Sequence, residues 1–174
     1  MYPYLRLMAI LLTARRRPAL GASDRTELEF RVGPFDGDLF GELNNSRYLT
    51  FAELARWDYS MRVGFVGVMR RNGWGLAVGG VSLRYRRRIP VFSKFRLTTE
   101  LVCHDGRWFY FLQEFHRQGK ICASALMKVG ATSKQGLVPA TEVLDALGES
   151  VDPEMPEWVG AWINAEGQRP WPEA

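Results

Sequence analysis

The sequence FDGDLFGELNNSRYLTFAELAR, Phe35 to Arg56, is the most informative part of the chain about its fold. It opens as a loop with two aspartates and two glycines, passes two asparagines, and enters the strongest helical pattern of the chain. The helix is expected to start between Asn44 and Ser46, because Asn and Ser side chains both cap free helix amides. Apolar residues then follow helical spacing on two flanks: Tyr48, Phe51, Ala52, Ala55 and Tyr59 on one, and Leu54, Trp57 and Met61 on the other. A helix with two apolar flanks is covered on more than one side, which predicts a curved sheet wrapped around it.

Five other segments alternate between apolar and polar residues, as half-buried strands do. They are Thr26–Val32, Trp74–Ile89, Lys94–Cys103, Trp108–His116 and Ile121–Thr132. The pair Gly79-Gly80 indicates a bulge, and Asp105-Gly106 indicates a hairpin turn. One strand, a long helix and then four strands in succession predict an α+β domain with a five-stranded antiparallel sheet.

The two ends of the chain are predicted to be helical arms. We divide the sequence into an N-terminal arm (1–22), a central domain (23–135) and a C-terminal arm (136–174). The apolar stretch Leu5–Leu12 is far too short to span a bilayer. It is read as a short amphipathic helix that either docks on the domain, the favoured alternative, or lies on a membrane surface. The C-terminal arm contains two helical segments, Thr141–Leu147 and Pro156–Glu166.

Composition limits the classes of function. The chain has 174 residues and a formal charge of +4, and this charge suits an anionic ligand. The sequence lacks the strong basic stripe of a nucleic-acid-binding protein. Its two cysteines, Cys103 and Cys122, are read as buried apolar residues of a cytoplasmic protein. The only histidines, His104 and His116, lie on separate segments, and no metal site is expected.

The loop and the helix start carry the chemistry of interest. A carboxylate such as Asp38 can attack a carbonyl carbon or deprotonate a water molecule. Free backbone amides at the start of a helix can stabilise the negative oxygen that results. The same residue types are also ordinary turn and cap residues, so the pattern alone leaves a purely structural role open.

The segment Asp38-Leu39-Phe40-Gly41-Glu42-Leu43-Asn44-Asn45-Ser46-Arg47-Tyr48 resembles the entry to the central helix in hotdog-fold acyl-CoA thioesterases of the 4-hydroxybenzoyl-CoA thioesterase type. It matches their Asp, Gly, Asn-Asn and Tyr, and it has Glu42 where they have His. The stretch Pro156–Asn164 resembles the thioesterase superfamily member 6 group. The resemblance covers about residues 25–165 and implies a hotdog fold, hydrolysis of an acyl-CoA and a homodimer or dimer of dimers.

The resemblance also implies roles for single residues. Asp38 would be the nucleophile or general base, and the amides near Asn45 and Ser46 would bind the oxyanion. A second thioesterase class has its carboxylate two turns into the helix, where this chain has Glu53; Asp36 ranks third. The substrate-binding positions are then Gly41, Glu42, Asn44, Ser46 and Tyr48, with Phe51 and Tyr59 as further walls of an acyl pocket.

Three arginines that share one strand face, Arg84, Arg86 and Arg88, are candidates for the phosphates of coenzyme A, although a solvated sheet face explains them equally well. No cofactor is expected beyond coenzyme A as part of the substrate. The alternative function is a non-catalytic protein that binds acyl-CoA or lipid. A hotdog dehydratase is disfavoured, because no His lies between Asp36 and Val63 to form the Asp–His pair of those enzymes.

Overall fold

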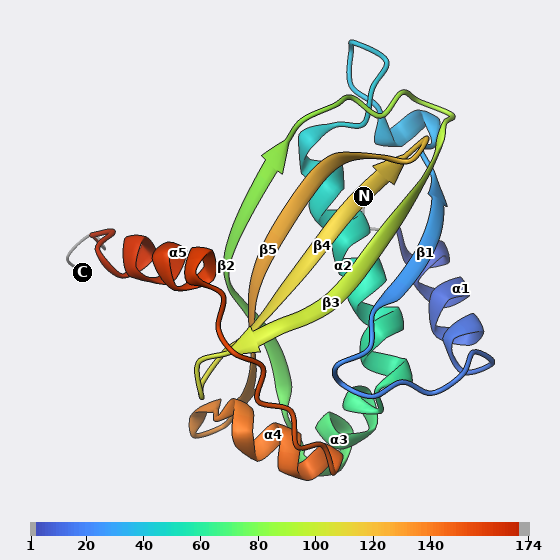
Figure 1. The fold of residues 1–174 in the computed structure, drawn as a ribbon. Coiled ribbons are helices and arrows are strands. Elements are labelled where there is room, and N and C mark those ends of the chain that lie inside the picture. Colours follow the sequence, from blue (N-terminus) through green and yellow to red (C-terminus); the bar gives the residue numbers. More distant parts are fainter. Residues whose placement is uncertain (1–2, 171–174) are drawn as a thin grey trace.

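A computed structural model describes residues 3–170. The sheet is built from β1 (Thr26–Arg31), β2 (Gly75–Tyr85), β3 (Lys94–His104), β4 (Phe109–Arg117), β5 (Lys120–Ser133) and β6 (Gly136–Val138). The helices are α1 (Tyr4–Ala14), α2 (Asn45–Arg62), α3 (Phe65–Asn72), α4 (Ala140–Leu147) and α5 (Glu157–Gly167), with a short 3-10 turn, η1 (Pro34–Asp36), before the carboxylate loop. Figure 1 shows the sheet curling around α2, which is the hotdog arrangement expected from the sequence.

The sheet runs in the order β1-β3-β4-β5-β2, and all of its pairs are antiparallel. It has one strand more than the sequence predicted, because β6 folds back onto the end of β5. A strand of three residues is too short to show an alternation of apolar and polar residues, so β6 could not be predicted from the sequence. β2 stands at one end of the order, which leaves one of its backbone edges unpaired within the described chain.

The core is formed where α2 presses on the concave face of the sheet. Phe51 and Leu54 are fully buried, and the Phe51 ring lies edge-on to Phe95, with centroids 5.1 Å apart. Edge-to-face aromatic contacts of this kind add about 0.5–1.5 kcal/mol beyond area burial. α2 also packs against α1 and α3, in addition to β1 and β3, so the prediction of a helix covered on several sides is confirmed.

The long second strand ends earlier than the sequence indicated. β2 stops at Tyr85 rather than Ile89, because the next two amides, those of Arg86 and Arg87, both turn to the carbonyl oxygen of Cys122, at 2.8 and 2.9 Å. One acceptor shared by two successive donors ends the ladder. Of the three arginines predicted to share a strand face, Arg84 alone lies within the strand.

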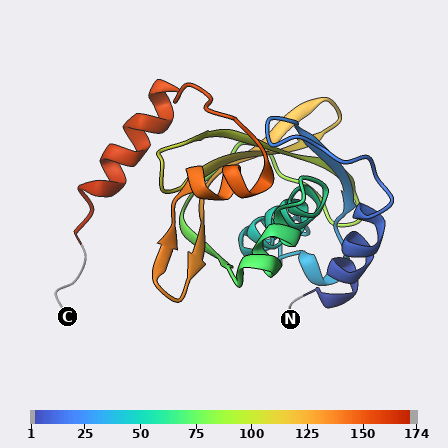
Figure 2. The ribbon, with the colours of Figure 1, turned by 90° about the horizontal axis from the view of Figure 1, so that it is seen from below.

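The Gly79-Gly80 bulge is confirmed by a register shift between Val78 and Gly80. Its physical reason is the packing of two indole rings. A Cβ atom at Gly79 would meet the Trp108 ring at 2.7 Å, and one at Gly80 would meet Trp162 of α5 at 3.1 Å. Figure 2 shows α5 on the side of the sheet away from α2, so the glycines admit side chains that cover the outer sheet face.

The N-terminal helix packs on the domain. Leu7 and Ile10 of α1 contact the main core, and Arg6 forms an ion pair of 2.8 Å with the buried carboxylate of Asp36. Further along, Arg17 contacts the fully buried Asp58 at 3.0 Å. The opposite face of α1 exposes Leu5, Met8 and Leu12. Among residues 3–170, no helix is long and apolar enough to cross a bilayer.

Replacing Gly79 with Ala should lower the free energy of unfolding by about 1–3 kcal/mol, because the new methyl group overlaps a rigid, packed indole ring. Gly67→Ala is the matched control. It lies in the exposed interior of α3, where a Cβ atom meets only the end of Arg71 at 3.4 Å, so it should add about 0.5–1 kcal/mol. Urea denaturation measures both; equal effects of the two variants would contradict the packing argument.

Candidate functional site

The loop that precedes α2 contains a tight turn built by Asp38 and Gly41. The amide of Gly41 donates to the Asp38 carbonyl oxygen at 3.2 Å, and the Asp38 amide donates to the carbonyl oxygen of Glu42 at 2.9 Å. Gly41 has a φ of 72°, a left-handed conformation that favours glycine. The spacing Asp-x-x-Gly is therefore explained by the geometry of the turn.

The same turn fixes the carboxylate of Asp38. Its Oδ1 atom accepts hydrogen bonds from the amides of Phe40 and Glu42, at 2.8 and 3.3 Å. Within the described part of the chain, Oδ2 has no hydrogen-bond partner, and the side chain is half-buried. Asp38 thus offers one held and one open carboxylate oxygen, which suits either attack on a carbonyl or activation of a water molecule.

The helix begins at Asn45, with Asn44 as its N-cap, which settles the choice between Asn44 and Ser46. The Asn44 side chain accepts the amide and the hydroxyl of Ser46, at 2.9 and 2.8 Å, and the amide of Arg47 donates to the Asn44 carbonyl at 2.8 Å. No acceptor for the amide of Asn45 is found among residues 3–170. This N–H stands at the positive end of a helix of 18 residues.

Tyr48, one turn into the helix, packs against Tyr85 and Phe115 of the sheet, with ring centroids 5.0 Å apart in both pairs. Burial raises the pKa of the Tyr48 phenol far above its usual value, and the nearby Cys122, Glu42, Tyr85 and Asp38 raise it further. Tyr48 is therefore neutral at physiological pH. The Tyr85 hydroxyl, in turn, donates to the Asn45 carbonyl oxygen at 3.3 Å. The structure thus gathers Asp38, Glu42, Asn45 and Tyr48 at one place.

Asp36, the third-ranked carboxylate, is a structural residue. It is buried, and it accepts the Gly33 amide at 2.8 Å in addition to its ion pair with Arg6. The guanidinium of Arg47 lies 3.7 Å away on the other side. With these three partners, its carboxylate links α1, η1 and α2 rather than facing a substrate.

Glu53 lies in a different part of the structure from Asp38 and the start of α2. Together with Thr50 and Arg56 it lines an open groove of about 450 Å³ between α2 and the strands β2 and β5. Glu53 follows Asn45 by eight positions, which is about 12 Å along a helix. The structure therefore does not bring Glu53 to the group formed by Asp38 and Asn45.

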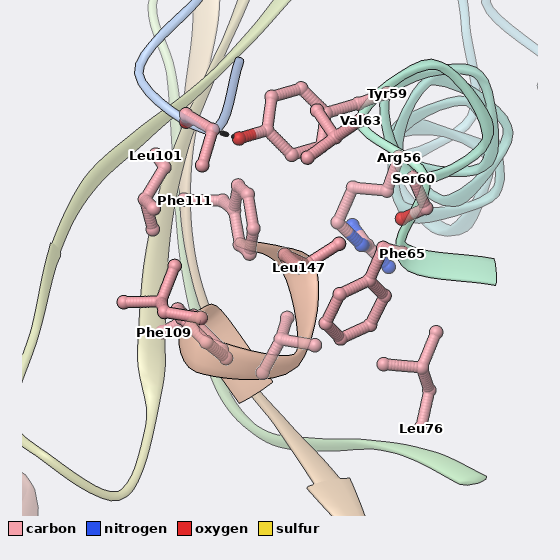
Figure 3. Close-up of a pocket in the computed structure, with 13 residues that line it drawn as sticks. Arg56, Tyr59, Ser60, Val63, Phe65, Leu76, Leu101, Phe109, Phe111 and Leu147 are labelled. Carbon is pink, nitrogen blue, oxygen red and sulfur yellow. Dashed lines mark hydrogen bonds between the residues drawn. The ribbon is translucent and has the colours of Figure 1, made fainter. Parts of the chain in front are cut away.

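The groove leads to an apolar cavity of about 50 Å³, shown in Figure 3. Arg56, Ser60, Leu76 and Val129 line both spaces. The cavity wall is aromatic and aliphatic, and includes Tyr59, Phe65, Phe109, Phe111, Leu144 and Leu147. Of the three expected acyl-pocket walls, Tyr59 lines this cavity, whereas Tyr48 and Phe51 are buried in the core.

Sequence reasoning missed the polar pair of Gln113 and Arg56, of which Arg56 lines both the groove and the cavity. Gln113 of β4 is fully buried; its side chain donates to the Ala52 carbonyl oxygen at 2.9 Å and accepts the Arg56 guanidinium at 2.8 Å. A signal was present, because Gln113 interrupts an inward-facing row of phenylalanines, Phe109, Phe111 and Phe115. A polar residue in such a row needs a partner.

The arginines proposed for phosphate binding are exposed at the end of β2 and beyond it. Within the described chain, Arg84, Arg86 and Arg88 have no carboxylate partner, while the neighbouring Arg87 donates to the Ile121 carbonyl oxygen at 3.0 Å. The same part of the chain contains no group of three or more His, Cys, Asp or Glu side chains placed to hold a metal ion.

Comparison with known proteins places this geometry in a family. The sequence model of the Thioesterase-like superfamily matches residues 32–163. Protein THEM6 of Xenopus laevis is 33% identical over 136 residues, which are 76% of this chain and 64% of that protein. The long-chain acyl-CoA thioesterase FadM of Escherichia coli is 25% identical over 103 residues, which are 58% of this chain and 78% of FadM.

A solved structure supports the fold independently. The DHNA-CoA thioesterase of Staphylococcus aureus superposes with a TM-score of 0.61 at 18% identity, and the match covers 82% of this chain and 91% of that one. The chain spans about two thirds of the length of the Xenopus protein that it matches, or 64%. The family match extends from Val32, before the Asp38 turn, to Ile163 in α5. This chain is a member of the thioesterase-like superfamily and has its hotdog fold.

Proposed function

We propose that this protein hydrolyses an acyl-CoA thioester to the free acid and coenzyme A. Asp38 either attacks the thioester carbonyl carbon directly or removes a proton from the water molecule that attacks it. The carbonyl oxygen becomes negative, and the open N–H of Asn45 donates a hydrogen bond to it. The C–S bond then breaks and the coenzyme A thiolate leaves. If Asp38 attacks directly, water afterwards hydrolyses the anhydride that forms.

One observation carries this proposal. The Asn45 amide has no acceptor in the described chain, and it lies at the positive end of α2, next to the loop that holds Asp38. A donor that is fixed before the reaction stabilises developing charge without reorganisation, and removal of one such donor typically costs about 10²–10³-fold in rate. The site therefore combines the two groups that acyl transfer requires.

The remaining spaces suit the rest of an acyl-CoA. The groove and its apolar cavity would take the acyl group, since their walls are largely aliphatic and aromatic. The exposed Arg84, Arg86 and Arg88 would bind the phosphates of coenzyme A. The name of FadM as a long-chain acyl-CoA thioesterase supports this substrate class. No cofactor other than the coenzyme A of the substrate is needed for this chemistry.

Glu42 favours a second candidate, a protein that binds acyl-CoA without cleaving it. Its carboxylate lies near Tyr48 together with Asp38. The Glu42 carboxylate adds a second negative charge beside Asp38, and its repulsion opposes the formation of an oxyanion. Such a protein would bind acyl-CoA saturably and release no thiol.

We also propose that the chain forms a homodimer, or a dimer of dimers, through β2. This strand ends the sheet, and Leu76, Val78 and Val81 on it are exposed. An apolar edge strand of 11 residues would promote aggregation unless it is covered. Pairing of β2 with its copy across a two-fold axis would cover it and close the groove that Glu53 lines.

Asp38→Asn should lower kcat by at least about 10²-fold, because the amide keeps the hydrogen bonds of the turn but is neither a base nor a strong nucleophile. Glu53→Gln should retain most activity. Release of free thiol from acyl-CoAs of graded chain length measures both variants. Full activity of Asp38→Asn together with an inactive Glu53→Gln would show that Glu53, in the groove, is the catalytic carboxylate. No thiol release by the unchanged protein, with saturable binding, would establish the non-catalytic alternative.

Asn45→Pro should lower kcat by about 10²–10³-fold, because proline removes the proposed oxyanion donor. Proline is well tolerated at the first position of a helix, and the extended conformation of Asn44, with ψ 139°, suits a following proline. Asn45→Ala is the matched control, since it removes the side chain and keeps the N–H. Equal activity of the two variants, with helix content verified by circular dichroism, would eliminate this amide from the mechanism.

Val81→Lys should yield a monomer in sedimentation velocity, because it buries a charge in the proposed β2 interface. Ile121→Lys, at the β4–β5 hairpin, is a control of equal exposure, 38% against 37% for Val81, and should sediment like the unchanged protein. A monomeric unchanged protein would refute the dimer.

A further inference from the structure

The hairpin that contains Asp38 has two highly exposed apolar side chains at its tip. Leu39 and Phe40 are 102% and 86% exposed. Turn tips are ordinarily polar, since Gly, Asn, Asp and Ser favour them. Two large apolar residues held in water by a well-defined turn are costly unless something covers them.

Other exposed apolar residues lie at the same end of the molecule. Phe92 is joined to the hairpin through its neighbour, because the Val91 amide donates to the Gly41 carbonyl at 2.9 Å. Phe35 belongs to η1, directly before the hairpin, and is 89% exposed. We call Phe35, Leu39, Phe40 and Phe92 the tip cluster. In Figure 1 its loops form the upper end of the domain.

Four arginines lie on chain segments next to the tip cluster. The Arg31 guanidinium donates a hydrogen bond to the Phe92 carbonyl oxygen at 2.8 Å. Arg86, Arg87 and Arg88 stand on the segment that pairs with the base of the hairpin, where the Leu43 amide donates to the Ile89 carbonyl oxygen at 2.8 Å. The hairpin itself contributes two carboxylates, Asp38 and Glu42, so the four arginines outnumber them. Asp36 does not enter this count, because Arg6 forms an ion pair with it at 2.8 Å.

We propose that the tip cluster is a membrane-docking surface for bilayers with anionic headgroups. Apolar side chains would enter the interface between headgroups and acyl chains, and the arginines would contact lipid phosphates, to which an anionic surface attracts them. The excess of positive charge distinguishes this partner from a second copy of the chain. A two-fold contact through the same patch would oppose the arginines of one copy to those of the other.

The docked orientation has a consequence for the site. Asp38 directly precedes Leu39, so insertion of the hairpin would bring the proposed catalytic carboxylate to the membrane surface, where long-chain acyl groups partition. The docking itself does not depend on the proposed hydrolysis, and it can be measured without any substrate.

Cosedimentation of the purified chain with vesicles tests the proposal. Vesicles of phosphatidylcholine with about a third phosphatidylglycerol should bind the protein, and pure phosphatidylcholine vesicles should bind it far less, with the difference reduced by salt. Leu39→Ser/Phe40→Ser should weaken binding by at least about tenfold, because two inserted side chains are lost. Trp158→Ser, a half-exposed aromatic residue on α5, should bind like the unchanged protein.

Three results would overturn the proposal. The first is an unchanged protein that binds neither kind of vesicle. The second is a Leu39→Ser/Phe40→Ser variant that binds fully while Leu5→Ser/Met8→Ser/Leu12→Ser does not, because the outer face of α1 would then be the docking surface. The third is a smaller oligomer of the tip variant in sedimentation velocity without any vesicle binding, because the patch would then join copies of the chain. Both variants change exposed residues, and circular dichroism verifies their fold.

Discussion

The position at which α2 begins controls the rest of the site. Three short contacts fix it: the side-chain cap of Asn44, the bond from the Asn44 amide to the Asp36 carbonyl oxygen at 2.9 Å, and the bond from Leu43 to Ile89. Because the helix cannot start one residue earlier or later without losing its cap, the first free amide is always that of Asn45. Burial of Phe51 and Leu54 under the sheet then holds the helix in register with this start.

Features that depend on neighbouring residues could be predicted from the sequence. The Asp38–Gly41 turn, the Asn cap, the Asp105-Gly106 hairpin and the helical stripe of α2 each need only a few consecutive residues. The Asp105 case shows how local such devices are. Burial raises the pKa of its carboxyl, but hydrogen bonds from Tyr110 and from the amides of Trp108 and Arg107, with a smaller effect of the Lys128 charge, outweigh burial and lower it. The three hydrogen-bond donors all lie within five positions of Asp105.

Features that depend on distant residues could not be predicted. Arg6 neutralises Asp36 from thirty positions away, and this ion pair, together with the contacts of Asp36 to the Gly33 amide and to Arg47, distinguishes Asp36 from Asp38, two residues later. The early end of β2 depends on the Cys122 carbonyl, which belongs to another strand. Arg56 and Gln113 are 57 positions apart, and only the broken row of phenylalanines indicated that Gln113 needed a partner. The spacing of apolar residues predicts which face of a helix or strand is buried, but it does not predict which distant residues pack against that face.

Glu42 shows why a departure from a family pattern can leave the fold unchanged. The turn uses the backbone of this residue, whose carbonyl and amide both bond to Asp38, so His and Glu serve the turn equally. The side chain alone differs, and it places a negative charge near Asp38 and Tyr48. Repulsion between that charge and an oxyanion must be offset by the Asn45 N–H and the helix dipole, whose effect is confined to the first turn. The proposed hydrolysis would therefore depend on a short distance between the thioester oxygen and the Asn45 N–H, more than it would with a neutral His at position 42.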